Sequence, residues 1–458
     1  MTSNPVWAVA RNTIRQAIRV RSAFAIMALY LVLVPTLPFT VQGDGTLRGQ
    51  LHVIIGYSLI SAGILLGILT LALSTTTLWS ELREKQIYLI EARPVHRWQV
   101  LLGKLVGILS INAALLAFMA IVTWGSVQYL AQRPQWNKTE RVLARQQVLT
   151  SRRIVNPQPE NLDADVERAY EALKKRGRLP TEKTEWEIRD QIRKELLVEL
   201  NAVRPRVGRI WRFEGLGVAR RAKENFTLRF KFATSRDIEE PLLTGWEVGD
   251  RKSPNFLRYR APYKADEVHQ VQLPTRAIAE DGSLEVRLYN IDPRMFTLVF
   301  SGPDSMQVLI RAGSFASNLV RGLWLIFVEV LFLAVLGLFC STFMSFPVSP
   351  VVALSLFIVI YLASSVKAEF DQGLSIADKG SKSGQAFELV VRGITNTIRF
   401  VLPPFDKYAA STPVSEGEEV PWTMILEATG AIAILRGGIL MLIGALIFER
   451  RELALASR

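Results

Sequence analysis

Few residues of this 458-residue chain are of the types that carry out covalent chemistry. Its one cysteine, Cys340, lies inside an apolar run, and its three histidines (His52, His96 and His269) are far apart and form no pair at helical spacing. This excludes a disulfide within the chain and argues against a histidine metal site. The sequence has no phosphate loop, H-E-x-x-H, G-x-S-x-G or C-x-x-C motif. We therefore expect a non-catalytic chain that binds no cofactor or metal of its own.

Two charged residues lie inside long apolar runs, where charge is costly. Glu329 is about 11 residues into the run 318–344, and Arg436 is about 14 residues into the run 422–448. At 1.5 Å per residue, both lie roughly 16–21 Å from the outer end of a helix. Charges at such depth usually face protein or water. Either the two residues pair, or Glu329 lines a transport path; a purely structural ion pair, or an Arg436 that extends to the membrane surface, is the alternative.

The apolar residues are gathered into runs of the length that crosses a membrane. Hydrophobic residues make up 49% of the chain, and a helix of about 20 residues spans a hydrocarbon core of roughly 30 Å. We expect six spans, near 22–41, 53–79, 105–130, 318–344, 350–366 and 422–448. The predicted fold class is an α-helical polytopic membrane protein with six transmembrane helices. A large polar insertion, 131–317, separates spans 1–3 (22–130) from spans 4–6 (318–458).

Residues 1–21 predict an amphipathic helix that lies in the headgroup region. Arg11, Arg15 and Arg19 share one arc of the helical wheel, and the opposite arc carries apolar residues such as Trp7 and Ile18. The apolar run that follows has no small-residue cleavage site, so a signal peptide is not expected.

The short loops set the expected orientation, because Lys and Arg gather on the cytoplasmic side. Residues 1–21 contain four arginines and no acid, loop 80–104 contains five Lys or Arg, and the C-terminal tail contains three arginines. The short loop 42–52 on the other side contains only Arg48. Both termini are therefore expected in the cytoplasm of a bacterial inner membrane. Residues 131–317 and loop 367–421 are expected outside, although the six Lys and Arg of 367–421 weaken this assignment.

The insertion has two parts with different periods. Residues 136–203 predict helices, including a capping box of Thr184 and Glu187. An apolar stripe at helical spacing follows it, formed by Ile188, Ile192, Leu196 and Leu200. Residues 207–310 alternate apolar and polar side chains, as in Phe226–Phe232 and Ser283–Leu288, and predict an antiparallel β-sandwich.

Two features of the insertion leave a choice of interpretation. Most of the net charge of +13 falls on it, which indicates either an ordinary solvated surface or a domain that meets anionic lipid or polysaccharide. Four aromatic residues form either core or a platform on which a sugar stacks: Trp211, Trp246, Tyr259 and Tyr263. Nothing in the sequence indicates nucleic-acid binding.

The segment between the second and third runs reads ELREKQIYLIEARPVHRWQVLLGK, from Glu81 to Lys104. It resembles the cytoplasmic loop of the type-2 permeases of ATP-binding cassette (ABC) exporters, in which an acidic–basic stretch and an apolar turn precede Pro-x-x-Arg and Gly-Lys. The matching residues are Glu81, Arg83, Glu84, Pro94, Arg97, Gly103 and Lys104. Gln86–Ile87 replace the Gly-Thr pair frequent in that family. The stretches NPVWAVARNTIRQAIR, LPPFDKY and IFERREL are also similar to family features.

The resemblance implies a coupling helix that docks on a separate cytoplasmic ATPase, with Glu91 and Arg93 added to the docking residues. ATP and magnesium would be bound by that partner. The permease chains would pair as a homodimer or heterodimer and export a substrate that the sequence does not name. Arg93 and Arg97, four residues apart, would share one face of the helix, with Pro94 in its first turn. The alternative for this segment is a basic anchor at the headgroups.

Two other functions compete with the exporter. One is an ion-coupled secondary transporter that uses Glu329, although the inverted repeats typical of that class are not evident. The other is a membrane-anchored extracytoplasmic binding or assembly protein, in which the spans only hold the insertion. Six spans and a long cytoplasmic loop exceed what anchoring requires.

Overall fold

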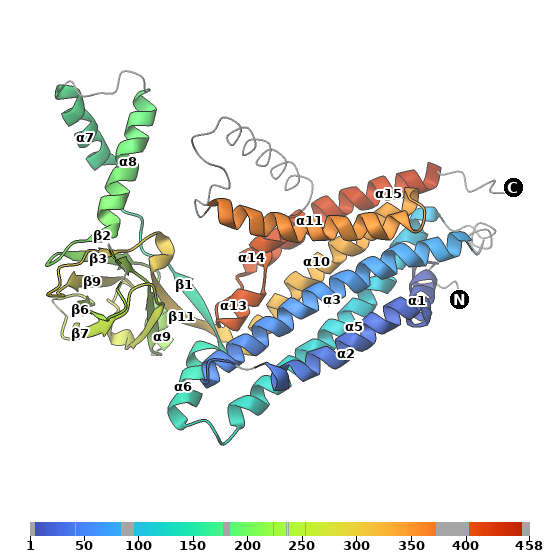
Figure 1. Ribbon diagram of the computed structural model, residues 1–458, viewed down its shortest axis with the longest axis horizontal. Coiled ribbons are helices and arrows are strands. Elements are labelled where there is room, and N and C mark those ends of the chain that lie inside the picture. Colours follow the sequence, from blue (N-terminus) through green and yellow to red (C-terminus); the bar gives the residue numbers. More distant parts are fainter. Residues whose placement is uncertain are drawn as a thin grey trace. The chain divides into compact units, whose positions relative to one another are not determined.

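The computed structural model describes residues 5–41, 43–83, 96–176, 184–222, 224–234, 236, 238–251, 253–371 and 403–450. The chain forms two compact units. The helical unit consists of Met1–Ser151 and Gly313–Arg458, and the sheet unit consists of Arg152–Ala312 (Figure 1). The helical unit therefore includes residues 131–151 and 313–317, which were expected to belong to the insertion 131–317.

Helices and short helical turns make up the helical unit. They are α1 (Pro5–Arg19), α2 (Arg21–Thr40), α3 (Leu47–Arg83), α5 (Arg97–Gln132), α6 (Lys138–Gln147), α10 (Phe315–Phe343), α11 (Val348–Asp371), the 3-10 turn η3 (Phe405–Tyr408), α13 (Ser411–Ser415), α14 (Trp422–Ala428), the π-helix η4 (Thr429–Gly437) and α15 (Gly438–Arg450). Helix α6, expected in the insertion, belongs here because it packs on α3 and buries Ala144 in the core of this unit.

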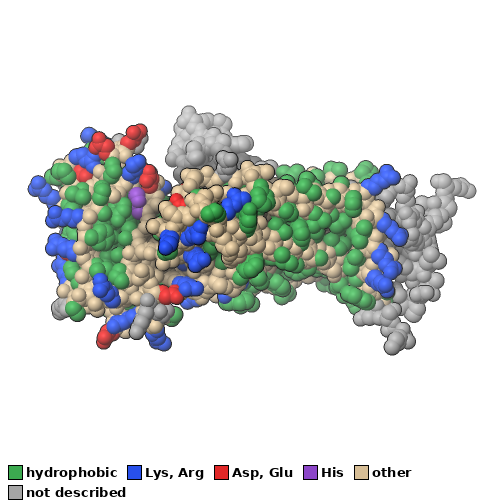
Figure 2. Space-filling model, turned by 90° about the horizontal axis from the view of Figure 1, so that it is seen from below, with side chains coloured by type: hydrophobic (Ala, Val, Ile, Leu, Met, Phe, Trp, Pro, Cys, Tyr) green, Lys and Arg blue, Asp and Glu red, His purple; other side chains and the backbone are tan. Residues whose placement is uncertain are grey.

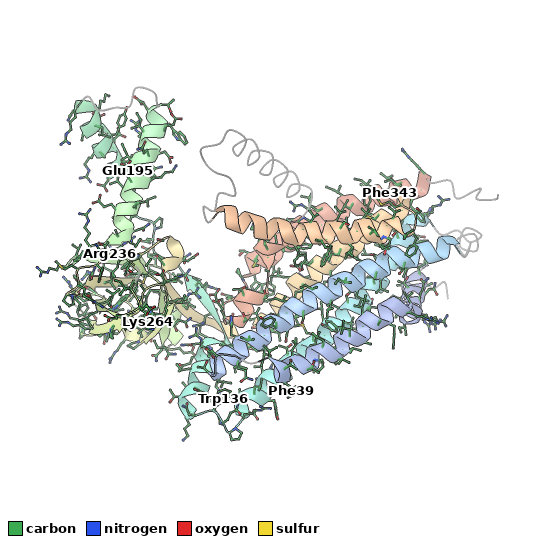
Figure 3. All side chains as sticks on the ribbon, viewed as in Figure 1. Phe39, Trp136, Glu195, Arg236, Lys264 and Phe343 are labelled. Carbon is green, nitrogen blue, oxygen red and sulfur yellow. The ribbon has the colours of Figure 1, made fainter. Side chains whose placement is uncertain are left out.

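Five helices among the described residues are long and apolar enough to cross a membrane. They are Ala23–Thr40, Leu47–Thr77, Arg97–Gln132, Phe315–Phe343 and Trp422–Arg450. The remaining expected span, 350–366, falls in α11, whose apolar part Val348–Tyr361 is shorter. The chain thus fits a polytopic membrane protein with a β-rich insertion. Phe39 and Trp136 lie at one end of the helical unit and Phe343 at the other (Figure 3).

Helix α10 is the centre of the helical unit. It contacts α3, α5, α11, α13, α14, η4 and α15, and it is apolar on every side, as expected of a helix surrounded by protein. Gly337 lets α3 approach closely, since a Cβ atom there would lie 1.9 Å from Ser74 Oγ. Ser341, one turn later, donates a hydrogen bond to its own helix at the Gly337 carbonyl oxygen (2.8 Å).

The sheet unit contains short strands and a helical hairpin; strands β1 and β11 run across its boundaries. The strands are β1 (Thr150–Val155), β2 (Ala202–Val203), β3 (Gly208–Phe213), β4 (Phe226–Phe230), β5 (Ala233–Thr234), β6 (Leu242–Val248), β7 (Leu257–Tyr263), β8 (His269–Leu273), β9 (Leu284–Asn290), β10 (Leu298–Val299) and β11 (Met306–Ser314). The helical pieces are α7 (Asp163–Lys175), α8 (Glu185–Asn201), α9 (Gly217–Ala222), η1 (Thr275–Ala277) and η2 (Pro303–Ser305).

The strands form three sheets, in the orders β1-β11-β4-β8, β2-β10-β5 and β3-β9-β6-β7. Side chains from all three share one hydrophobic core. Within it the rings of Phe230 on β4 and Trp246 on β6 have centroids 4.4 Å apart. Strand β9 alternates buried and half-buried residues along its whole length, as its sequence pattern predicts.

The helical hairpin α7–α8 confirms the local predictions for this region. Thr184 Oγ1 accepts a hydrogen bond from the Glu187 amide, and the Glu187 carboxylate accepts one from the Thr184 amide (2.8 Å). Ile188 and Ile192 are buried against Tyr170 of α7. Within 136–203, where helices are expected, Thr150–Val155 instead forms strand β1, which pairs with β11.

Candidate functional site

The structure describes only part of the segment expected to couple to an ATPase. Glu84, Glu91, Arg93 and Pro94 lie outside the described residues, as do Gln86 and Ile87. Glu81 and Arg83 belong to the last turn of α3, and their side chains are not described. At 1.5 Å per residue, α3 and α5 are each about 55 Å long, so both extend well beyond a hydrocarbon core of about 30 Å.

Arg97 joins the start of α5 to the end of α15. Its Nη1 atom donates hydrogen bonds to the carbonyl oxygens of Phe448 (2.9 Å) and Glu449 (3.2 Å), and its guanidinium lies 5.9 Å from the centroid of the Phe448 ring. The last carbonyl oxygens of a helix carry partial negative charge, so a cation there is stabilising. Next to this contact, Leu101 and Phe448 form a small apolar cluster.

Arg97 is also the first residue of its helix. His96 before it has an extended backbone (φ −68°, ψ 143°), and its amide donates to Gln99 Oε1 (3.1 Å). His96 is therefore not helical, and α5 begins at Arg97. Arg93 lies outside the described residues, so a helical face shared by Arg93 and Arg97 stays a prediction.

Lys104 is not a surface residue of a loop. It lies in the second turn of α5, fully buried, and its Nζ atom donates a hydrogen bond to the Thr77 carbonyl oxygen of α3 (3.1 Å). Lys104 thus links α3 to α5 from a buried position, and its part in coupling to an ATPase stays a prediction.

Two glycines bring α1 against α5. A Cβ atom at Gly103 would lie 2.8 Å from the carbonyl oxygen of Val6, and one at Gly107 would lie 2.8 Å from that of Ala10. Small residues four apart allow two helix backbones to approach in this way. The buried face of α1 is narrow and consists of Ala10, Thr13 and Ala17.

The remaining apolar residues of α1 do not share that face. Trp7 and Ile18 are each about 60% exposed, and Arg11, Arg15 and Arg19 are exposed as well. The predicted apolar arc therefore divides between residues that pack on α5 and residues that remain on the surface. Taken together, α1, α3, α5 and α15 are joined at one end of the helical unit (Figure 1).

A second group of interest surrounds Glu329, at the midpoint of the 29-residue helix α10. Its side chain is 92% buried, since the residue is only 8% exposed. It lines a cavity of about 220 Å³ together with residues of α3, α11, η3 and α13. The polar lining residues are Glu329, Tyr361, Asp406 and Ser411.

Glu329 and Arg436 do not pair. Among the described residues, Glu329 makes no hydrogen bond or ion pair, whereas Arg436 Nη1 donates to the Ala431 carbonyl oxygen of its own π-helix, η4 (3.3 Å). Of the two hypotheses for these charges, the ion pair is wrong. Glu329 on the wall of a cavity is what the structure shows; a transport role for that cavity is untested.

The four aromatic residues of the sheet unit, for which either a core or a sugar-stacking role was open, pack in or against the core. Trp246 is fully buried and Trp211 is 5% exposed, and Tyr259 and Tyr263 pack against the same core. These aromatics therefore belong to the core, as the alternative interpretation stated. A cleft of about 880 Å³ does lie beside Trp211, lined by Arg209, Glu160 and Asn201 among others.

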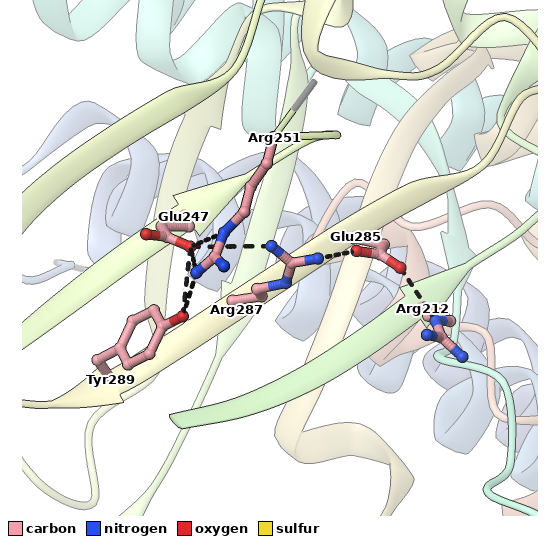
Figure 4. Close-up of polar contacts among 6 residues, drawn as sticks. All are labelled: Arg212, Glu247, Arg251, Glu285, Arg287 and Tyr289. Carbon is pink, nitrogen blue, oxygen red and sulfur yellow. Dashed lines mark hydrogen bonds and ion pairs between the residues drawn. The ribbon is translucent and has the colours of Figure 1, made fainter. Parts of the chain in front are cut away.

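Sheet β3-β9-β6-β7 carries an ion-pair network that the sequence did not reveal (Figure 4). Glu247 on β6 is 5% exposed and accepts hydrogen bonds from Arg251 (Nη2 to Oε2, 2.6 Å) and from the Tyr289 hydroxyl (3.3 Å). Arg258 and Arg287 lie within 4 Å of the same carboxylate. Glu285 links Arg287 to Arg212. These residues come from four adjacent strands, β3, β9, β6 and β7, and from the β6–β7 loop, which is why no sequence motif marks them.

No group of three or more His, Cys, Asp or Glu residues in the described part of the chain is arranged to hold a metal ion. No protein-family model matches the chain, and no curated protein matches it significantly. The comparisons thus assign no family, and the resemblance to type-2 permeases rests on the residues quoted above.

Proposed function

We propose that this chain is the membrane-spanning permease subunit of an ABC exporter of the type-2 class. In this proposal a separate cytoplasmic ATPase binds ATP and magnesium, docks on the segment 84–96, and drives export of an unidentified substrate across a bacterial inner membrane. The chain acts as a homodimer or heterodimer, with six spans per chain and α11 as the fifth.

One observation carries the proposal: α1, α3, α5 and α15 are held together near the last turns of α3 and the first turns of α5, the two helices that the segment 84–96 connects in the chain. Helix α3 leads into this segment and α5 leaves it. Lys104 bonds α3 to α5, Arg97 bonds α5 to α15, and Gly103 and Gly107 seat α1 on α5. A force applied to the segment would therefore move several helices together, as a receiving element for a motor protein requires.

The distribution of side chains supports the proposed orientation. Basic side chains gather at the end of the helical unit where α1 and the end of α15 lie, and apolar side chains cover much of its flank (Figure 2). The exposed residues there include Arg11, Arg15 and Arg450. Lys and Arg gather on the cytoplasmic side of a membrane, so this end faces the cytoplasm and residues 131–317 and 367–421 face outside.

Aromatic residues on α5 support the membrane placement. Trp98 and Trp124 are both about half exposed, and their 26-residue separation corresponds to about 39 Å along a helix. Tryptophan is enriched at the two membrane–water interfaces, which lie about 40 Å apart when the headgroup regions are included.

The proposal is tested by photo-crosslinking in native membranes. A photoreactive phenylalanine derivative at Arg93 should capture a chain with nucleotide-binding motifs, identified by mass spectrometry. The same probe at Gln132, at the far end of α5, should not capture it. The purified complex should hydrolyse ATP with vanadate sensitivity, and deletion of 91–97 should abolish both the capture and the ATPase activity. If no ATP-hydrolysing chain is recovered from position 93, the exporter proposal fails.

A further inference from the structure

The cavity is lined by the buried carboxyl group of Glu329, which has no hydrogen-bond or ion-pair partner among the described residues. Glu329 is more than nine-tenths buried at the middle of α10, about 21 Å from either end of the helix. No hydrogen bond or ion pair reaches its carboxylate from the described residues. Tyr361 and Asp406, which also line the cavity, do have interactions of their own. A buried carboxylate without a partner is costly, and such groups in membrane helices mark functional sites.

The other residues that line the cavity indicate which class of ligand would pair with the Glu329 carboxylate. Among the described residues, those that line the cavity include no Lys or Arg. Most of its wall is apolar, and the rings of Tyr361 and Phe405 have centroids 6.1 Å apart. Aromatic faces attract cations, and more strongly where water is excluded.

We propose that this cavity binds a small organic cation of the ammonium class, with Glu329 as its counter-ion and the apolar wall around its carbon skeleton. A cation of this kind neutralises the carboxylate and buries its own apolar surface in one step. The proposal rests on the exporter function only in naming this cation as the class of substrate carried; the binding itself needs no ATPase.

The composition of the wall argues against an inorganic cation. Magnesium and calcium require six or more oxygen ligands, whereas the side-chain oxygens of the described lining come from four residues, two of which have further interactions. Water occupies about 30 Å³ per molecule in the liquid, so a cavity of about 220 Å³ has room for roughly seven or eight non-hydrogen atoms. Benzylamine, which is protonated at neutral pH, matches both this size and the aromatic wall.

The test is equilibrium binding to the full chain in lipid nanodiscs, with empty nanodiscs subtracted. Three aromatic probes of similar size differ in charge: benzylamine is cationic, benzyl alcohol is neutral, and benzoate, which is one non-hydrogen atom larger, is anionic. We expect benzylamine to bind at least tenfold more tightly than the other two. Glu329→Gln, which keeps the shape and removes the charge, should abolish this preference and leave benzyl alcohol unchanged.

Two further variants separate the site from general effects. Gly63→Leu adds a side chain whose Cβ would lie 3.7 Å from the Tyr361 hydroxyl, so it fills the cavity and should weaken benzylamine and benzyl alcohol alike. Glu140→Gln, on α6 outside the cavity, should bind all three probes as the natural protein does.

Three results would overturn the inference. They are equal binding of benzylamine and benzyl alcohol, an unchanged preference in Glu329→Gln, and displacement of benzylamine by potassium ions, which would indicate an inorganic site. Failure of the exporter proposal is distinguishable: benzylamine would still bind through Glu329, but no ATPase would be captured at position 93. If the ATPase is captured and benzylamine does not bind, only the inference about the substrate fails.

Discussion

The guanidinium of Arg97 donates to the carbonyl oxygen of Phe448 at 2.9 Å, across 351 positions of sequence. This contact fixes the first turn of α5 to the last turn of α15. It also places a charged donor on carbonyl oxygens that have no partner within their own helix. The proposed coupling segment, 84–96, is thus followed directly by Arg97, a residue that is bonded to another helix.

Replacement of Arg97 should loosen the end of α15. Hydrogen bonds that involve a charged group contribute about 1.5–3 kcal/mol each, so we expect Arg97→Ala to destabilise the contact by about 2 kcal/mol. Hydrogen exchange of the amides in α15 of the full-length protein measures this loss of stability.

Arg97→Lys keeps the charge but loses the second donor group of the guanidinium, and should have about half the effect. Arg450→Ala removes an exposed charge at the same end and should change exchange by less than about 0.5 kcal/mol; an effect equal to that of Arg97→Ala would contradict the assignment.

The close packing of α1 on α5 can be tested with two matched glycine substitutions on α5. Gly107→Ala places a Cβ atom 2.8 Å from the Ala10 carbonyl oxygen, whereas Gly125→Ala meets nothing within 4 Å. We expect Gly107→Ala to cost about 1–3 kcal/mol through forced separation of the helices. Gly125→Ala should be neutral or stabilise α5 by up to about 1 kcal/mol.

The readout for this pair is protease cleavage after the arginines of α1, which are reached more easily when α1 separates from α5. Faster cleavage is expected for Gly107→Ala and an unchanged rate for Gly125→Ala. Equal rates in the two variants would show that α1 does not depend on the close approach at Gly107.

The parts of this structure that were predictable are local. The capping box at Thr184 and the stripe from Ile188 depend on residues within a turn or two of each other, and the structure confirms both. The alternation along β9 depends only on the pleat of a strand with one buried face. Five apolar runs form helices long enough to cross a membrane, and this too depends only on the length and composition of each run.

The parts that were not predictable depend on distant partners. Strand β1 pairs with β11, which follows it by some 150 residues, and nothing within TSRRIV indicates this. Lys104 matched a loop motif, yet the long α5 begins before it and buries it against Thr77. The cavity at Glu329 is assembled from four elements besides α10. The apolar run of α10 therefore revealed an acidic residue inside a span, but it could not reveal the cavity beside that residue.

Acid should weaken the sheet unit through Asp292. Its buried carboxylate accepts hydrogen bonds from Arg294 (Nε, 2.9 Å) and from the Leu243 amide (2.9 Å). The bond from the Arg294 guanidinium is the main cause that lowers the pKa of Asp292 to about 2. A folded-state pKa below the unfolded value of about 3.9 contributes stability that is complete above pH 4 and is lost as the pH falls toward 2.

The shift corresponds to about 2 kcal/mol. Urea unfolding of the natural protein and of Asp292→Asn, compared at pH 6 and at pH 2.5, isolates this contribution because other groups titrate in both proteins. We expect the natural protein to be more stable than the variant at pH 6, with most of that difference gone at pH 2.5. A difference that does not change with pH would show that Asp292 is not the group responsible.

The network around Glu247 should fail when its central carboxylate is neutralised. Glu247→Gln keeps the shape but removes the charge that faces Arg251 in the β6–β7 loop and Arg287 on β9. Removing one partner of a buried ion pair costs about 3–5 kcal/mol, because the remaining charge is left uncompensated. Arg251 is half exposed and recovers hydration, so we expect the lower end of this range. Hydrogen exchange of the β6 and β9 amides measures the loss of stability.

The control is Arg212→Gln, which removes an exposed arginine from the edge of the same network and should cost less than about 1 kcal/mol. Equal losses in the two variants would contradict the central place of Glu247.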